Sequence, residues 1–248
     1  MSAAQGLLRR TAAAALAVTL STVLAPPAAA RNAGAGNERA DRSWAQMTAA
    51  GPSFFGSVET RSTDMTPVAK WRAVLGRYAS DLARADGCRA GAACPGQEWS
   101  KLTAALAPLA PMAQVARVTA ALNAKAYVTD AANWGVSDYW QTPAEFLARG
   151  GDCEDFAIAK YLALRAAGWA AGDLRVVVVI DERRAAGHAV LIASHRGHAW
   201  LLDNLTDEII DAQAIQHYRA VFSVSETAWW WHRPAPVRHA SETAPAGR

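Results

Sequence analysis

Hydrophobic residues recur at helical spacing in the first part of the chain. Apolar side chains at three- and four-residue intervals predict a helix over 67–85, with Pro67 suited to its first turn. Two more helical stretches follow, one around Trp99 and one around Val115. Pro108 and Pro111 separate them, because proline cannot continue a helix. The first half of the chain is therefore predicted to be helical.

Capping signals define the middle of the chain. The segment 142–145, Thr-Pro-Ala-Glu, has the capping-box pattern and predicts a short helix that ends at Gly150-Gly151. Asp152 is placed to cap the next helix, predicted over 153–167. Residues 127–141 are polar and aromatic and are expected to form a loop.

The pattern then changes to that of strands. Continuous apolar or alternating runs predict strands over 174–180, 188–194 and 198–203, the last two joined by a tight turn at Arg196-Gly197. Residues 222–231 are expected to add a final strand. Helices followed by an antiparallel sheet predict an α+β fold.

Composition restricts the function only broadly. The chain has 248 residues, of which 52% are hydrophobic, and this is enough for one globular domain. The formal net charge is +3, and the sequence contains no long basic run. Nucleic acid is therefore not expected as a partner.

The pattern divides the precursor into four parts. Residues 1–30 begin with a segment that contains Arg9 and Arg10, followed by a short apolar run and an Ala-x-Ala cleavage site. This pattern predicts a signal peptide that is cut after Ala30. The alternative is an uncleaved membrane anchor. We expect a loose N-terminal arm over 31–64, the folded domain over 65–232 and a disordered tail over 233–248. The mature protein is therefore expected to be exported to the periplasm.

Export changes the interpretation of the three cysteines. Cys88 and Cys94 bracket a short loop and are expected to form a disulfide in an oxidising compartment. Cys153 is then the unpaired one. It lies in the first turn of a predicted helix, where the unpaired N–H groups favour a thiolate, so it is a candidate nucleophile. The alternatives are an intermolecular disulfide and an inert structural thiol.

A cysteine nucleophile needs a base and a group that orients the base. His188 begins one predicted strand, and the neighbouring strand ends at Asp203. A hairpin loop of two or four residues places the two side chains on the same face, whereas a three-residue loop brings Asn204 to that side instead. We expect Asp203, because a carboxylate stabilises an imidazolium.

These residues carry a family resemblance. The blocks Gly-Gly-Asp-Cys-Glu-Asp-Phe-Ala-Ile-Ala-Lys-Tyr (150–161), His-Ala-Val-Leu (188–191), Leu-Leu-Asp-Asn (201–204) and Asp-Tyr-Trp-Gln-Thr-Pro (138–143) resemble the bacterial transglutaminase-like cysteine peptidases. LapG-type periplasmic proteases of this family cleave large surface adhesins and so release cells from biofilms. The resemblance implies a papain-like, transglutaminase-type fold, with helices packed on an antiparallel sheet and the nucleophile at a helix N-terminus.

The resemblance also implies site residues and partners. It assigns Cys153 as nucleophile, His188 as base and acid, and Asp203 as the orienting group. It implies a calcium ion held by Asp152 and Glu154, with other oxygen ligands completing the shell. A surface adhesin as substrate and an inner-membrane regulatory receptor follow from the same likeness. The alternative for the two acids is that they only cap the helix and complement its dipole.

Acyl transfer also needs an oxyanion hole. The backbone N–H of Cys153 is one expected donor, and Asn133 or the Trp134 indole is a candidate for the second. The leading hypothesis is an exported cysteine endopeptidase. Two alternatives stay open from the residues alone: acyl transfer to an amine with the same triad, and an inactive binding module.

Overall fold

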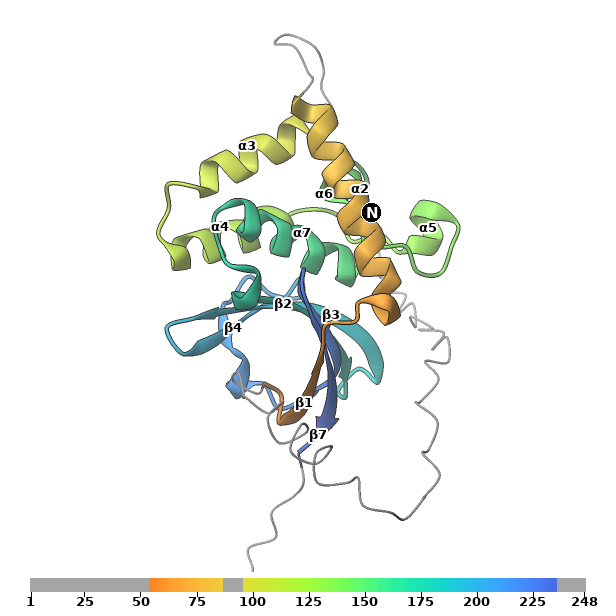
Figure 1. The fold of residues 1–248 in the computed structure, drawn as a ribbon, viewed down its shortest axis with the longest axis vertical. Coiled ribbons are helices and arrows are strands. Elements are labelled where there is room, and N and C mark those ends of the chain that lie inside the picture. Colours follow the sequence, from red (N-terminus) through yellow and green to blue (C-terminus); the bar gives the residue numbers. More distant parts are fainter. Residues whose placement is uncertain (1–53, 87–95, 236–248) are drawn as a thin grey trace, which may run out of the picture.

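The computed structural model describes residues 54–86 and 96–235. Helices form one layer and a curved antiparallel sheet forms the other, as Figure 1 shows. The predicted α+β class is therefore confirmed. Within the described part of the chain, no helix has both the length and the apolarity needed to cross a membrane.

The helices lie close to their predicted positions. The helices that begin at Pro143 and Cys153 start directly after their N-cap residues. The Thr142 hydroxyl accepts a hydrogen bond from the backbone N–H of Glu145 at 3.4 Å, and Asp152 is the N-cap residue before Cys153. The helical elements are η1 (Thr66–Val68), α2 (Ala69–Asp86), α3 (Gln97–Leu106), α4 (Pro111–Asn123), α5 (Asp130–Trp134), α6 (Pro143–Arg149), α7 (Cys153–Ala166), η2 (Ala171–Asp173) and η3 (Ala212–Ala214).

The sheet has seven strands in the order β1-β7-β6-β2-β3-β4-β5, and all neighbours are antiparallel. Its centre is the run of valines that was predicted as a buried strand. The strands are β1 (Ser57–Ser62), β2 (Leu174–Asp181), β3 (Ala186–His195), β4 (His198–Leu202), β5 (Ile210–Asp211), β6 (Tyr218–Val224) and β7 (Trp229–Pro234).

The core has two parts because alternate residues of the strands face opposite sides of the sheet. One side of β3, with Leu191 and Ala193, packs against the helices, and the other side, with Val190 and Ile192, belongs to a second apolar cluster. Helix α7 lies between the other helices and the sheet, and it is buried on nearly all sides. This packing fixes where Cys153, at the start of α7, meets the sheet.

Three expectations about the elements were wrong. Residues 127–141 are not wholly a loop, since Thr129 caps the short helix α5 with its side chain. The segment 222–231 is not one strand: β6 and β7 are joined by a turn in which Ser225 N–H donates to the Ala228 carbonyl at 2.8 Å. The described end of the presumed loose arm contains β1, which pairs with β7.

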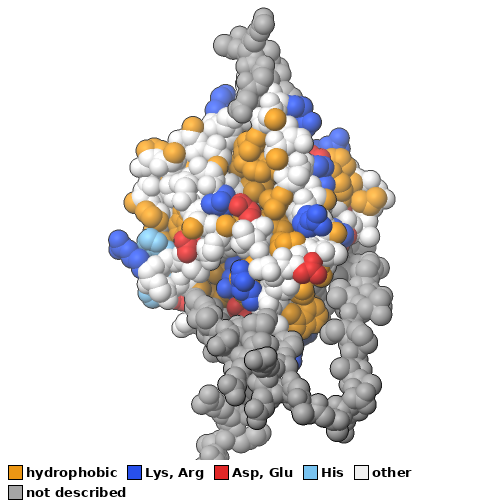
Figure 2. All heavy atoms as spheres, viewed as in Figure 1, with side chains coloured by type: hydrophobic (Ala, Val, Ile, Leu, Met, Phe, Trp, Pro, Cys, Tyr) orange, Lys and Arg blue, Asp and Glu red, His pale blue; other side chains and the backbone are white. Residues whose placement is uncertain are grey.

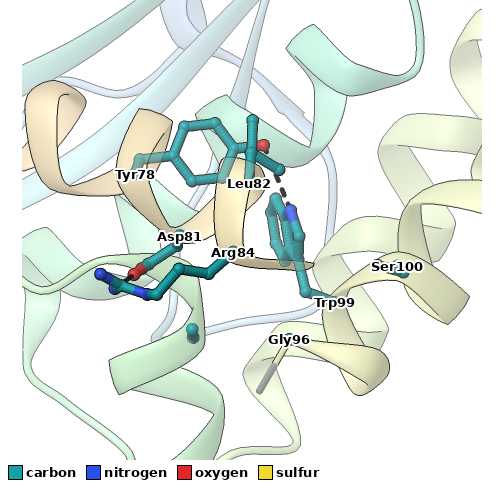
Figure 3. Close-up of a pocket in the computed structure, with 8 residues that line it drawn as sticks. Tyr78, Asp81, Leu82, Arg84, Gly96, Trp99 and Ser100 are labelled. Carbon is teal, nitrogen blue, oxygen red and sulfur yellow. Dashed lines mark hydrogen bonds and ion pairs between the residues drawn. The ribbon is translucent and has the colours of Figure 1, made fainter. Parts of the chain in front are cut away.

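The upper helices pack through aromatic side chains. Figure 3 shows the contact between α2 and α3, where the Trp99 indole donates to the Tyr78 hydroxyl at 3.2 Å. On the face shown in Figure 2, lysine and arginine side chains are interspersed with acids, in line with the small net charge. The expected signal peptide, the Cys88–Cys94 disulfide and most of the expected tail lie outside the described residues, although β7 continues to Pro234.

Candidate active site

The candidate nucleophile follows a glycine pair that has no room for side chains. A Cβ on Gly151 would lie 2.3 Å from a carboxylate oxygen of Asp155. Gly150 has φ +74°, and a Cβ there would lie 2.4 Å from the Ala126 carbonyl oxygen. The backbone of this segment pairs with residues 126–128, since Val128 N–H donates to the Gly151 carbonyl at 2.9 Å. The glycines thus let the chain approach closely just before Cys153.

The second part of the candidate site comes from the β3–β4 hairpin. His195 pairs with His198 across a two-residue turn, and Arg196 and Gly197 both have positive φ. This register places His188 and Asp203 on the same face. The imidazole Nε2 lies 2.9 Å from Asp203 Oδ1, and both side chains are buried, with 9% and 3% of their surface exposed. The expected His–Asp contact is therefore present.

Asp203 is held by more than the histidine. Its other oxygen accepts from the Tyr218 hydroxyl at 2.6 Å, and the backbone N–H of Leu205 donates to Oδ1 at 3.0 Å. Burial alone would raise the pKa of Asp203, but the hydrogen bonds and the facing His188 lower it to about 2. The carboxylate is therefore ionised at neutral pH and is fixed in one orientation.

Cys153 lies at the first position of α7 and is 4% exposed. Its thiol donates to Glu154 Oε2 at 3.2 Å. Burial raises the pKa of the Cys153 thiol well above its usual value, and the Glu154 and Asp152 carboxylates add to this. A hydrogen bond from the backbone N–H of Ala189, the neighbour of His188, acts in the opposite direction. The expected lowering by the helix dipole is thus outweighed by burial and by the acids.

Those acids belong to a dense carboxylate cluster. Oxygens of Asp130, Asp152 and Asp155 lie within 4.8 Å of one another, and so do oxygens of Asp130, Asp138 and Glu154. Burial raises the pKa of Asp152 to about 9, that of Asp155 to about 8 and that of Glu154 to about 7, and nearby carboxylates contribute in each case. So many carboxyl groups cannot all ionise here without a compensating positive charge.

The cluster contains carboxylate oxygens that have no partner. Oδ1 of Asp130 and Oδ1 of Asp152 are buried without a hydrogen bond among the described residues. Asp155, by contrast, accepts from the Gln141 backbone at 2.8 Å and from the Asp152 backbone at 3.2 Å. Hard carboxylate oxygens that lack donors are the ligands that calcium prefers. The residues therefore fit a calcium ion, with Asp155 more engaged in holding the helix start.

Sequence reasoning missed Asp130, the residue common to both carboxylate groups. Its backbone N–H donates to Asp152 Oδ2 at 3.4 Å, so α5 lies directly beside the start of α7. Asp130 occupies a segment predicted to be a loop, and nothing in its local sequence indicates a ligand. Tyr218 was missed for a similar reason, because its role depends on the pairing of β6 with β2.

The candidates for the second oxyanion donor differ in their surroundings. The Asn133 side-chain amide donates to the Gly150 carbonyl at 3.1 Å and so is already engaged. The Trp134 indole N–H is buried without a partner among the described residues, and the ring packs against Tyr139 and Arg149. The Trp134 indole N–H is therefore the candidate donor that has no acceptor among the described residues. Its role as the second oxyanion donor stays a prediction.

Comparisons with known proteins agree with this geometry. The sequence model of the bacterial transglutaminase-like cysteine proteinases (BTLCP) matches residues 85–232. Among solved structures, calcium-bound LapG from Legionella pneumophila is 26% identical, with a TM-score of 0.52, covering 66% of this chain and 93% of that one. The EGTA-treated form of LapG is 27% identical, with a TM-score of 0.50, covering 67% of this chain and 85% of that one. Among curated proteins, none matches the chain.

A cysteine at the start of a helix and a buried His–Asp pair on the sheet against which that helix packs are the side chains that a cysteine peptidase requires. The family match covers more than half of the chain. The protein therefore belongs to the bacterial transglutaminase-like cysteine proteinases and is a cysteine peptidase with a fold like that of LapG.

Proposed function

We propose that the protein is an exported cysteine endopeptidase in which Cys153, His188 and Asp203 form the catalytic triad. The observation that carries this proposal is the buried 2.9 Å contact between His188 Nε2 and Asp203. The backbone N–H of Ala189, the neighbour of His188, lowers the pKa of the Cys153 thiol, which supports a close approach of β3 to the start of α7.

The contacts assign a role to each group. Asp203 holds Nε2, which leaves Nδ1 of His188 to take the proton of the Cys153 thiol. The sulfur attacks the carbonyl carbon of the scissile peptide, and the imidazolium then gives its proton to the leaving amine as the C–N bond breaks. Water, deprotonated by the same imidazole, hydrolyses the thioester and restores the thiol.

We also propose that Asp130, Asp152 and Glu154 hold a calcium ion next to the nucleophile. The unpartnered oxygens of Asp130 and Asp152 support this assignment, as does the description of LapG as calcium-bound. When bound, the ion supplies the positive charge that allows these carboxylates to be ionised together. Asp155 contributes to the site chiefly by fixing Gln141 and the first turn of α7.

The biological setting is proposed on other grounds. The sequence of residues 1–30 supports export to the periplasm, where Cys88 and Cys94 would be oxidised to a disulfide. A large surface adhesin as the protein substrate and an inner-membrane receptor as regulator are proposed from the sequence resemblance of residues 150–161, 188–191 and 201–204 to the family.

The test of the triad is the activity of single variants on a protein substrate. We expect Cys153→Ala and His188→Ala each to lower kcat by about 10⁵-fold or more, because the members act as a unit. Asp203→Asn should lower kcat by about 10⁴-fold, since the amide favours the wrong imidazole tautomer. Initial rates and far-UV circular dichroism are measured together, so that loss of activity is separated from loss of fold.

A surface His–Asp pair provides the matched control. His198 Nδ1 lies 2.8 Å from Asp211, but this pair is exposed. We expect His198→Ala to keep wild-type kcat. Wild-type rates for a folded Cys153→Ala variant would show that the nucleophile has been misassigned.

A further inference from the structure

A cavity of about 260 Å³ opens beside Asp203. Its wall includes Asp203 and Tyr218, the pair whose hydrogen bond orients the candidate triad. The β2–β3 turn contributes Arg183 and Arg184, while apolar side chains come from β4 and from the segment after it: Leu201, Leu205, Ile210 and Ile215. The cavity is thus mostly apolar, with cationic groups on one wall.

The two carboxylates in this wall are already engaged. Asp181 Oδ1 accepts from the backbone N–H groups of Arg183 and Arg184, at 3.0 and 3.3 Å, and its Oδ2 lies 3.6 Å from the Arg184 guanidinium. Asp203 accepts from Tyr218 and faces His188. Neither acid therefore pairs with the Arg183 guanidinium.

Arg183 is the arginine of this wall whose side chain has no direct partner among the described residues. Its guanidinium has no hydrogen-bond or ion-pair partner within residues 54–86 and 96–235, and it is exposed to solvent at the cavity. The turn that carries Arg183 is held by the Asp181 side chain, so the guanidinium is presented from a fixed backbone. A guanidinium in this situation favours a carboxylate, which it can bind through two parallel hydrogen bonds.

The chemistry of the triad indicates which part of a substrate passes this cavity. The following step rests on the proposed function. His188 must give its proton to the leaving amine, so the residues after the scissile bond lie on the imidazole side of the thiol. Asp203 is on the far side of that imidazole, and the cavity borders Asp203. Residues on the leaving-group side of the substrate therefore pass next to the cavity.

We propose that this cavity is a substrate subsite that binds a glutamate or aspartate on the leaving-group side of the scissile bond, with Arg183 binding the carboxylate. The methylene groups of the substrate side chain pack against the leucine and isoleucine wall. The carboxylate reaches the guanidinium at the rim. The preferred substrates are thus proteins with an acidic residue within a few positions after the cleaved bond.

The test uses a mixture of synthetic peptides of defined sequence in which residues are varied evenly. The cleaved bonds are identified by mass spectrometry for the wild type, for Arg183→Glu and for Arg117→Glu. Arg117 is an exposed arginine on α4 and serves as the matched control. We expect acidic residues after the wild-type cleavage sites to be enriched about fivefold, the effect of one partly exposed ion pair. Arg183→Glu should replace this preference with one for lysine and arginine, and Arg117→Glu should leave it unchanged.

Salt provides a second measurement. The preference should shrink at about 1 M NaCl, where charges are screened within about 3 Å. An absence of acidic enrichment in the wild type, or its persistence in Arg183→Glu, would overturn the subsite while leaving the peptidase assignment intact. Failure of the wild-type protein to cleave any peptide or protein would overturn the proposed function, and the subsite with it.

Discussion

Lys160 lies in the middle of α7 with its side chain fully buried. Its ammonium group has no hydrogen-bond partner among the described residues. The carboxylates of Asp203 and Asp207 favour the charged form, but desolvation is stronger and lowers the pKa of Lys160 to about 7. A buried amine of this kind reduces the stability of the fold, in contrast to the apolar residues around it.

We expect Lys160→Met to raise the free energy of unfolding by an amount that depends on pH. The unfolded lysine has a pKa of about 10.4, so between about pH 7 and pH 10 the unfolded chain binds more protons than the native one. Wild-type stability should therefore rise with pH across this window. The advantage of Lys160→Met, on the order of 5 kcal/mol at about pH 6, should disappear as the pH approaches 10.4.

Urea unfolding at several pH values measures this difference. Lys101→Met, at an exposed lysine on α3, is the control and should show no such pH dependence. A Lys160→Met variant less stable than the wild type at every pH would mean that the ammonium is well hydrogen bonded in the native protein.

At the scale of residues, sequence reasoning succeeded where a local rule determines geometry. Asp203 was expected because a carboxylate stabilises an imidazolium, while the length of the hairpin loop was left open. The two-residue turn of the structure then places Asp203 on the same side of the sheet as His188. Asp130 was not predictable in this way, because its neighbour Asp152 lies far along the chain and the two segments meet only in the folded protein.

At the scale of elements, the boundaries of helices were predicted best, because capping residues mark where a helix begins and proline marks where one cannot continue. The helices after Thr142 and Asp152 begin where their caps indicate. The short strand β1 was missed because its sequence, Ser-Val-Glu-Thr-Arg-Ser, lacks an apolar alternation, and its pairing partner β7 is at the other end of the chain. The turn between β6 and β7 was missed because it contains neither glycine nor proline.

The junction between α6 and α7 gives a prediction at this scale. Gly151→Ala should lower the free energy of unfolding by about 2 kcal/mol, the usual effect of overpacking, because the new methyl group would meet the side chains of Asp155 and Gln141. It should also lower activity, since those side chains hold the first turn of α7. Thermal denaturation and initial rates measure the two effects.

Gly76 lies where an added methyl group should stabilise the fold, in contrast to Gly151. It lies within α2, and a Cβ built there meets nothing within 4 Å. Gly76→Ala should therefore raise the free energy of unfolding by about 0.5–1 kcal/mol without changing activity. Equal effects of the two substitutions would show that the Gly151 segment is free to move away from α7.

At the scale of the whole molecule, the candidate site joins three distant parts of the fold. Helix α7 carries Cys153, the β3–β4 hairpin carries His188 and ends before Asp203, and α5 carries Asp130. The order of helices and strands predicted the fold class, and the resemblance to a family linked Cys153 with the hairpin. Neither source predicted that α5 closes the carboxylate cluster, because a helix of five residues has little pattern of its own.

Calcium is expected to link the stability of the whole domain to this cluster. An ion that binds only the native state stabilises it by about 2.7 kcal/mol when its concentration is a hundred times Kd. For a domain of this size, that corresponds to a rise in Tm of about 5–10 °C. We expect EGTA to lower Tm and activity together, and Ca²⁺ to restore both more fully than Mg²⁺, which requires tighter octahedral geometry.

Neutral substitutions of the cluster acids should separate two effects on Tm: loss of calcium binding and relief of repulsion between the carboxylates. Asp130→Asn and Glu154→Gln each remove one charge from a crowded set, so in EGTA each variant should melt at or above the wild-type Tm. In Ca²⁺ both should melt below the wild type, because they lose a ligand charge. Glu208→Gln, at an exposed acid remote from this cluster, should keep the full calcium-dependent shift. If Asp130→Asn and Glu154→Gln showed the same shift as the wild type, these carboxylates would not hold the ion, and their remaining role would be to complement the dipole of α7 and position its first turn.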